Sequence, residues 1–139
     1  MSMQPDDIAL NKGAIIERAL RRMKQEYEAN PQLDNYTHVD AMTLNVERAC
    51  QAAIDLAMHI VARRRLGMPQ SSAQAFELLY EAGCISQDVM KDMAAMTAFR
   101  NIAIHEYQRM DVSVLRHIAE TRWRSLVAYC RSLGVTIRP

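Results

Sequence analysis

The sequence has few residues that interrupt helices. Four glycines and four prolines occur among 139 residues, and no segment alternates apolar and polar side chains for long. Glycine and proline are the strongest markers of turns, whereas apolar residues here recur at intervals of three and four, which is the helical period. The sequence therefore predicts an all-α fold, an up-and-down helical bundle with two long helices and two or three shorter ones.

An excess of charge of either sign is also missing. Lys and Arg number 17 against 16 Asp and Glu, a formal net charge of +1. A polyanion held without local contacts needs a stronger overall field, so DNA is not an expected partner and any anion site must be local. No stretch approaches the roughly 18 apolar residues of a membrane span, and residues 1–7 do not resemble a secretory signal. We expect a single cytoplasmic domain over residues 1–139, with no membrane partner.

Cysteine pairs and clustered metal ligands are absent from the sequence as well. Cys50, Cys84 and Cys130 lie far apart among apolar residues, without C-x-x-C spacing. Buried free thiols are the expectation, and they suit a reducing compartment. The chain contains no clustered set of His, Cys and Asp residues of the kind that chelates zinc. Neither a metal nor another cofactor is expected.

Five helices follow from the apolar spacing and from the signals for helix ends. The expected starting residues, in chain order, are Asp6, Thr37, Ser71, Ser86 or Gln87, and Asp111. The second start rests on the capping-box spacing Thr37-x-x-Asp40. Gly67 and Gly83 are placed to end the second and third helices. The ten methionines are expected mainly in the core, where their flexible side chains fill gaps.

The nonamer FRNIAIHEY is the least ordinary stretch of the chain. On an unbroken helix, the side chains of Arg100 and His105 would lie about 140° apart, whereas Arg100 and Tyr107 would lie about 20° apart. Convergence of Arg100 and His105 therefore requires a turn between them, or a second copy of the motif brought close by dimerisation. The alternative is that Arg100 pairs with a carboxylate such as Asp92 or Asp111, and that His105 is an ordinary half-exposed residue.

This nonamer resembles the R-x(4)-H signature of the HEPN superfamily, in its extended form R-N-x-x-x-H-x-Y. The preceding segment, RACQAAIDLAMHIVARRRLGMPQSSAQAFELLYEAGCI, is similar to the body of the HepT family, the toxin halves of prokaryotic toxin–antitoxin pairs. The likeness extends over about residues 8–132. The bare arginine–histidine spacing is a weak signal, and its combination with Asn101, Tyr107 and these helical segments is far more specific.

The resemblance implies a homodimer of helical bundles in which two motifs face each other across a cleft. It also implies a metal-independent endoribonuclease. RNA carries its own nucleophile, the 2′-hydroxyl, beside the scissile phosphate, so the implied products are a 2′,3′-cyclic phosphate and a 5′-hydroxyl. His105 would move protons near neutral pH, Arg100 would bind the phosphoryl oxygens, and Asn101 would orient the histidine or the phosphate.

The resemblance also implies a protein partner, a minimal nucleotidyltransferase that acts as antitoxin. It would silence the nuclease by attaching AMP to Tyr107. The added phosphate would lie beside Arg100 and fill the anion site. Judged from the residues alone, Tyr107 is equally a half-buried aromatic residue at a helix end.

Asp55 and His59 are a further polar pair, four residues apart on the second helix, where they could hydrogen-bond to each other. They are either a surface pair or residues that line the dimer cleft and support the motif. A second class of function is a non-catalytic HEPN module that binds a nucleotidyltransferase partner or a nucleotide. Modules of that kind tend to lack the intact arginine–histidine pair, and this chain has both residues.

Overall fold

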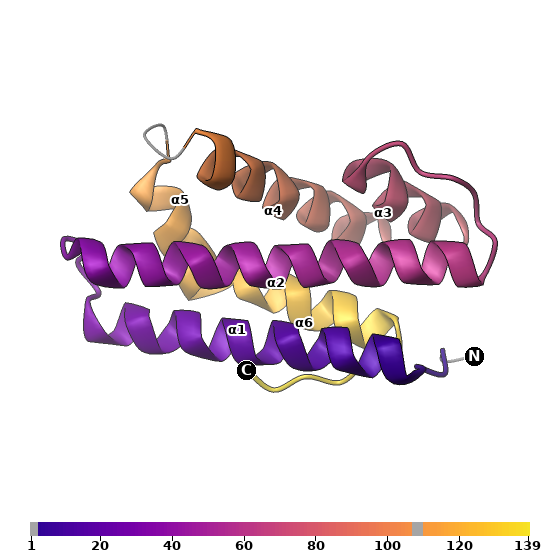
Figure 1. Cartoon of the computed structure of the whole chain (residues 1–139), viewed down its shortest axis with the longest axis horizontal. Coiled ribbons are helices and arrows are strands. Elements are labelled where there is room, and N and C mark those ends of the chain that lie inside the picture. The colour runs from indigo at the N-terminus through magenta and orange to yellow at the C-terminus, as the bar shows by residue number, and fades with distance from the viewer. Residues whose placement is uncertain (1–2, 107–109) are drawn as a thin grey trace.

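The computed structural model describes residues 3–106 and 110–139. Its elements, in chain order, are α1 (Asp7–Ala29), α2 (Tyr36–Arg63), α3 (Ser72–Glu81), α4 (Gln87–His105), α5 (Val112–His117), the π-helical segment η2 (Ile118–Arg122) and α6 (Trp123–Ser132). These described ranges contain no strand, and Figure 1 shows the two longest helices, α1 and α2, side by side. The predicted all-α bundle with two long helices is confirmed.

Most helices begin where a polar side chain accepts a hydrogen bond from a free amide of the first turn, as helix ends require. Asp6, Ser71, Ser86 and Asp111 are the N-cap residues of α1, α3, α4 and α5. Each accepts from an amide two or three residues ahead, at distances of 2.8 to 3.1 Å. These four predicted starts are confirmed.

The start of α2 differs from the prediction. Asn35 is the N-cap residue, and its side-chain oxygen accepts from the Thr37 amide at 3.0 Å. The helix therefore begins at Tyr36, and the capping box predicted at Thr37 and Asp40 is wrong. The physical reason is that asparagine is the stronger N-cap residue, so the helix begins two residues earlier than a threonine cap at Thr37 would allow.

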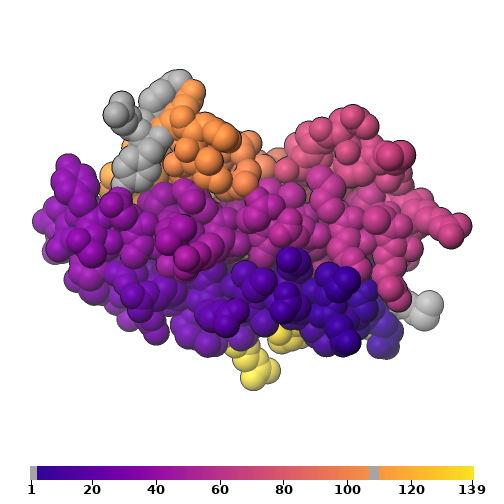
Figure 2. Space-filling view, in the orientation of Figure 1, coloured from indigo at the N-terminus to yellow at the C-terminus, as the bar shows by residue number. Residues whose placement is uncertain are grey.

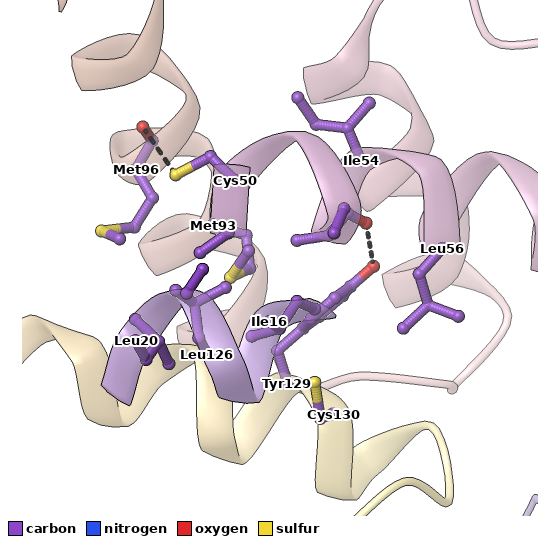
Figure 3. Close-up of a cluster of buried hydrophobic side chains, with 14 of the residues drawn as sticks. Ile16, Leu20, Cys50, Ile54, Leu56, Met93, Met96, Leu126, Tyr129 and Cys130 are labelled. Atoms are coloured by element: carbon purple, nitrogen blue, oxygen red, sulfur yellow. Dashed lines mark hydrogen bonds between the residues drawn. The ribbon is translucent and has the colours of Figure 1, made fainter. Parts of the chain in front are cut away.

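The core lies between the α1–α2 pair and two further helices, α4, which is drawn above α2 in Figure 1, and α6, which passes behind the pair. Tyr129 of α6 is fully buried, and its hydroxyl donates to the Ala53 carbonyl of α2 at 2.7 Å (Figure 3). Its ring meets Phe76 of α3 edge to face, with 5.7 Å between centroids. Met93 and Met96 of α4 are buried in the same core, as predicted for the methionines. One aromatic side chain thus ties three helices together.

The three cysteines are free and buried, as predicted. Burial raises the pKa of the Cys50 thiol and of the Cys130 thiol to about 12. Cys50 Sγ donates to the Met96 carbonyl at 3.7 Å, a contact drawn in Figure 3. Both residues therefore remain thiols at neutral pH and pack as small apolar side chains.

The last predicted helix is interrupted by η2, which the sequence did not indicate. Arg122, at the end of η2, donates to Asp92 of α4 at 2.8 Å, and Ser125 donates to the other carboxylate oxygen at 3.1 Å. This contact fastens the C-terminal helices to α4. None of the described helices is long and apolar enough to cross a membrane.

Candidate active site

Arg100, Asn101 and His105 all lie in the last two turns of α4. The helix is continuous from Gln87 to His105, so no turn separates the arginine from the histidine. Five residues of α-helix correspond to a rotation of about 140°, and the two side chains therefore leave α4 on different faces. Of the two routes to convergence, a turn between Arg100 and His105 is excluded by the structure.

Arg100 is half-buried and bonded to neutral partners. Its Nη2 donates to the side-chain oxygen of Gln51 on α2, and its Nη1 donates to Asn101 Oδ1 at 3.1 Å. The expected alternative, pairing with Asp92 or Asp111, is wrong, because Arg122 occupies the first carboxylate and the second caps α5. These partners hold the guanidinium in place without neutralising its charge.

The third nitrogen of the same guanidinium has no partner. Arg100 Nε is buried and forms no hydrogen bond to any described residue. A buried donor without an acceptor costs about 1–3 kcal/mol, and more when the group is charged. Most buried polar groups have a hydrogen-bond partner, so a buried donor without one is an exception that calls for an explanation. The described residues therefore leave the Arg100 Nε donor without an acceptor.

Gln51 was not predicted as a site residue from the sequence. Its side chain contacts Arg100 through its oxygen and a second partner, Asp55, through its nitrogen. Its amide nitrogen donates to Asp55 Oδ1 at 2.9 Å, and Lys12 Nζ of α1 lies 3.5 Å from Asp55 Oδ2. A chain of contacts thus runs from Arg100 through Gln51 and Asp55 to Lys12, and it orients the Gln51 oxygen toward the arginine. Glu47, Gln51 and Asp55 follow one another at four-residue intervals, a polar stripe that a helical projection of α2 would have revealed.

Asp55 and His59 bind other partners than each other, contrary to the expected pairing. His59 Nε2 lies 2.7 Å from Asp6 Oδ2 at the start of α1, and Arg63 Nε lies 3.4 Å from the same oxygen. Because α1 packs along α2, Lys12 of α1 lies beside Asp55, and Asp6, the N-cap residue of α1, lies beside His59. Asp55 therefore belongs to the Arg100 chain of contacts, and His59 belongs to a separate cluster at the start of α1.

The Arg100 charge affects the pKa of one nearby carboxyl group, that of Glu47. Burial raises the pKa of the Glu47 carboxyl, and the positive charge of Arg100 opposes that rise. The balance leaves Glu47 a weaker acid than an exposed glutamate. The Glu47 carboxyl and the Arg100 guanidinium therefore interact electrostatically.

His105 ends α4 and is exposed, with no hydrogen bond to the described part of the chain. Ile102 and Ile104 beside it are 40% and 43% exposed, and Val114 of the adjacent α5 is 41% exposed. Figure 1 shows α4 and α5 meeting at one end of the bundle. Ile102 and Ile104 thus leave exposed apolar surface on the last turn of α4, next to His105 in the sequence. Tyr107 lies outside the described residues.

Comparisons with known proteins give the site a context. A family model described as ribonuclease HepT-like matches residues 15–133. The chain is 37% identical over 116 residues to the mRNA nuclease HepT of Shewanella oneidensis, covering 83% of this chain and 87% of that protein. It is 31% identical over 101 residues to the tRNA nuclease HepT of Aphanizomenon flos-aquae, covering 70% of this chain and 67% of that protein.

Solved structures agree with the sequence comparison. The tri-AMPylated Shewanella oneidensis HEPN toxin in complex with its MNT antitoxin matches with a TM-score of 0.89 at 33% identity, over 94% of this chain and 98% of that one. A toxin–antitoxin structure with AMP-PNP matches with a TM-score of 0.88 at 32% identity, over 93% and 98% of the two chains. At these identities the likeness extends beyond the fold.

Proposed function

Because this chain belongs to the HepT-like ribonuclease family, we propose that it is an endoribonuclease toxin whose Arg100 and His105 act on a phosphodiester of RNA. The observation that carries the roles of these residues is the Arg100 guanidinium, which neutral side chains hold in place while its buried Nε has no partner. Three buried free thiols are typical of a reducing compartment, which supports action in the cytoplasm.

The proposed reaction uses the nucleophile that RNA itself carries. The 2′-hydroxyl oxygen attacks the adjacent phosphorus, the bond from phosphorus to the 5′-oxygen breaks, and a 2′,3′-cyclic phosphate forms. The His105 imidazole accepts the proton of the 2′-hydroxyl or supplies one to the leaving 5′-oxygen. Arg100 donates to the phosphoryl oxygens as negative charge develops. Asn101, bonded to Arg100 at 3.1 Å, supports its orientation.

The proposed active unit is a homodimer. Within one chain α4 carries Arg100 and His105 on different faces, so a single protomer does not aim both at one phosphate. A symmetric pair of chains would place two motifs across one cleft. The exposed Ile102 and Ile104 flank the histidine and would supply apolar surface to such an interface.

The direct test is RNA cleavage by the purified protein. Wild type is expected to leave 2′,3′-cyclic phosphate and 5′-hydroxyl ends, and His105→Ala is expected to lower the rate by about 10²–10⁴-fold, the usual contribution of a proton-transfer group. His117→Ala is the matched control, because His117 is also an exposed histidine at a helix end. Ends carrying a 3′-hydroxyl would refute attack by the 2′-hydroxyl. Bacterial growth arrest that His105→Ala leaves unchanged would favour a non-catalytic binding module.

We further propose that a minimal nucleotidyltransferase antitoxin silences the nuclease by transferring AMP to Tyr107. The related solved structure contains an AMPylated HEPN toxin with an MNT antitoxin, and Tyr107 is the tyrosine of the H-x-Y element in this chain. A phosphate attached there would bring negative charge to the anion site at Arg100.

The tyrosine assignment is tested with Tyr107→Phe. The variant is expected to cleave RNA at nearly the wild-type rate, to gain no AMP by mass spectrometry, and to remain toxic when the antitoxin is coexpressed. Tyr36→Phe serves as control, because Tyr36 is 81% exposed and lies at the start of α2. Loss of cleavage together with normal AMP transfer to Tyr107→Phe would reverse the assignment.

A further inference from the structure

Three arginines outside the candidate active site surround a hollow between α1 and α2. The hollow has a volume of about 470 Å³, and its lining residues are Ile15, Arg18, Ala19, Arg22, Asn45 and Arg48. Three of the six are arginines, and they come from both helices. Helices α1 and α2 lie side by side on the face shown in Figure 2. No acidic side chain lines the hollow.

The charges around this hollow are incompletely paired. Arg22 Nη2 lies 2.9 Å from Glu26 Oε1. Arg18 and Arg48 form neither a hydrogen bond nor an ion pair with any residue that the structure describes. The whole chain has a net charge of only +1, so this is a local concentration of positive charge. Like charges gathered around one space repel each other, and a bound anion would relieve that repulsion.

The hollow adjoins the chain of contacts that positions Arg100. Arg48 precedes Gln51 by three residues, which is slightly less than one turn of α2, and Gln51 accepts from Arg100. On the α1 side, Lys12 precedes Ile15 by three residues and contacts Asp55. In Figure 2 the orange part of α4 borders α2 on the same face as α1. Arg48 of the hollow and Gln51, the partner of Arg100, thus lie within one turn of each other on α2.

We propose that the Arg18–Arg22–Arg48 hollow is a phosphate-binding subsite for the backbone of the RNA substrate, beyond the scissile phosphate. The inference rests on the proposed ribonuclease function. A guanidinium donates two parallel hydrogen bonds to a phosphate and suits it better than an ammonium does. The buried Asn45 amide, 5% exposed, closes the hollow between the two helices. Phosphate contacts fix the register of a bound strand without reading its sequence.

The test measures RNA binding in a His105→Ala background, so that the substrate stays intact. The double variant Arg18→Ala/Arg48→Ala is compared with Lys91→Ala/Arg131→Ala, which removes the same charge from two exposed side chains that lack partners among the described residues. With a labelled single-stranded RNA of mixed sequence, the first pair is expected to weaken binding about tenfold. The slope of log affinity against log salt should fall by about 1.4, at about 0.7 per lost phosphate contact.

In the cleavage-competent protein, the same double variant is expected to raise KM and leave kcat unchanged, because the subsite is remote from the reacting atoms. An equal loss of affinity in the Lys91/Arg131 control would show a bulk charge effect and overturn the subsite. Unchanged RNA binding with weakened retention of the nucleotidyltransferase would also overturn it, in favour of a protein contact.

RNA cleavage and the salt dependence of RNA binding test the catalytic proposal and the phosphate subsite separately. If the wild type does not cleave RNA but the Arg18/Arg48 pair still governs the salt dependence of RNA binding, the subsite stands and the catalytic proposal fails. If the wild type cleaves RNA and the slope is unchanged by Arg18→Ala/Arg48→Ala, the subsite fails and the catalytic proposal stands. Thermal unfolding of both double variants verifies that neither result comes from a loss of fold.

Discussion

Two histidines of this chain have opposite surroundings. His59 has a side chain 19% exposed and lies 2.7 Å from a carboxylate oxygen of Asp6, which also receives Arg63. His105 is exposed at the end of α4, with no hydrogen bond to residues 3–106 or 110–139. The Nε2 atom of the His59 ring has a carboxylate partner, whereas the His105 ring has none among the described residues. The two rings thus differ in what the fold places beside them.

Two arginines show the same contrast. Arg122 donates to the carboxylate of Asp92, a partner of opposite charge. Arg100 donates to the neutral side chains of Gln51 and Asn101, and its positive charge partly offsets the rise that burial causes in the pKa of the Glu47 carboxyl. The positive charge of Arg122 is paired with the Asp92 carboxylate, and this ion pair joins η2 to α4. The side chains bonded to Arg100 carry no charge, so its hydrogen bonds to described residues position it without an ion pair.

The two arginines are expected to differ most in how a lysine substitution at each of them changes the rate of RNA cleavage. Arg100→Lys keeps the charge but loses the planar fork, and cleavage is expected to fall by about 10²–10³-fold. Arg122→Lys is expected to leave the cleavage rate unchanged and to lower the free energy of unfolding by up to about 1 kcal/mol, as for a partly exposed ion pair. Steady-state cleavage and urea unfolding measure the two effects. Equal losses of cleavage in both variants would contradict the distinction.

A smaller effect is expected at Gln51, which holds Arg100 without touching substrate. Gln51→Leu removes the acceptor for Arg100 and is expected to lower kcat by roughly tenfold to a hundredfold through misplacement of the guanidinium. The pH profile of cleavage should keep its shape, because His105 is unaffected. Asp55→Asn tests the next contact and should have a smaller effect in the same direction. A Gln51→Leu variant with wild-type kcat would remove Gln51 from the positioning network.

The smallest effect concerns stability at the His59 cluster. The amide of Ala9 and the ring of His59 hold the pKa of the Asp6 carboxyl below its ordinary value of 3.8. A carboxyl whose pKa is lowered by folding stabilises the protein above its unfolded pKa, and this stabilisation is lost as pH falls through the folded pKa. Asp6→Asn retains an N-cap side chain but loses the charge.

Asp6→Asn is therefore expected to be less stable than wild type at pH 7. The difference should shrink as pH falls below 3.8, where the wild-type carboxyl also becomes protonated. Urea unfolding at a series of pH values checks this, and RNA cleavage at pH 7 should be unchanged. A stability difference independent of pH would show that the charge of Asp6 has no part in it.

Sequence reading succeeded where the deciding contacts are local. The caps at Ser71 and Ser86 bond to amides three residues ahead, so their residue types and spacing were sufficient. It failed for Gln51 and His59, whose partners Arg100 and Asp6 are 49 and 53 residues away. A helical projection shows which side chains share a face of α2, but it does not show which helix that face will meet.

The sequence by itself determined the all-α class, most helix starts and the R-N-x-x-x-H-x-Y motif, because apolar periodicity and capping act over one or two turns. The tertiary structure decided which groups remain open to a ligand. It was the packing of α1 and α4 against α2 that satisfied His59, held Arg100 on Gln51 and gathered Arg18 and Arg48 around one hollow. Side-chain partners across helices depend on how the helices pack, and no local pattern contains that information.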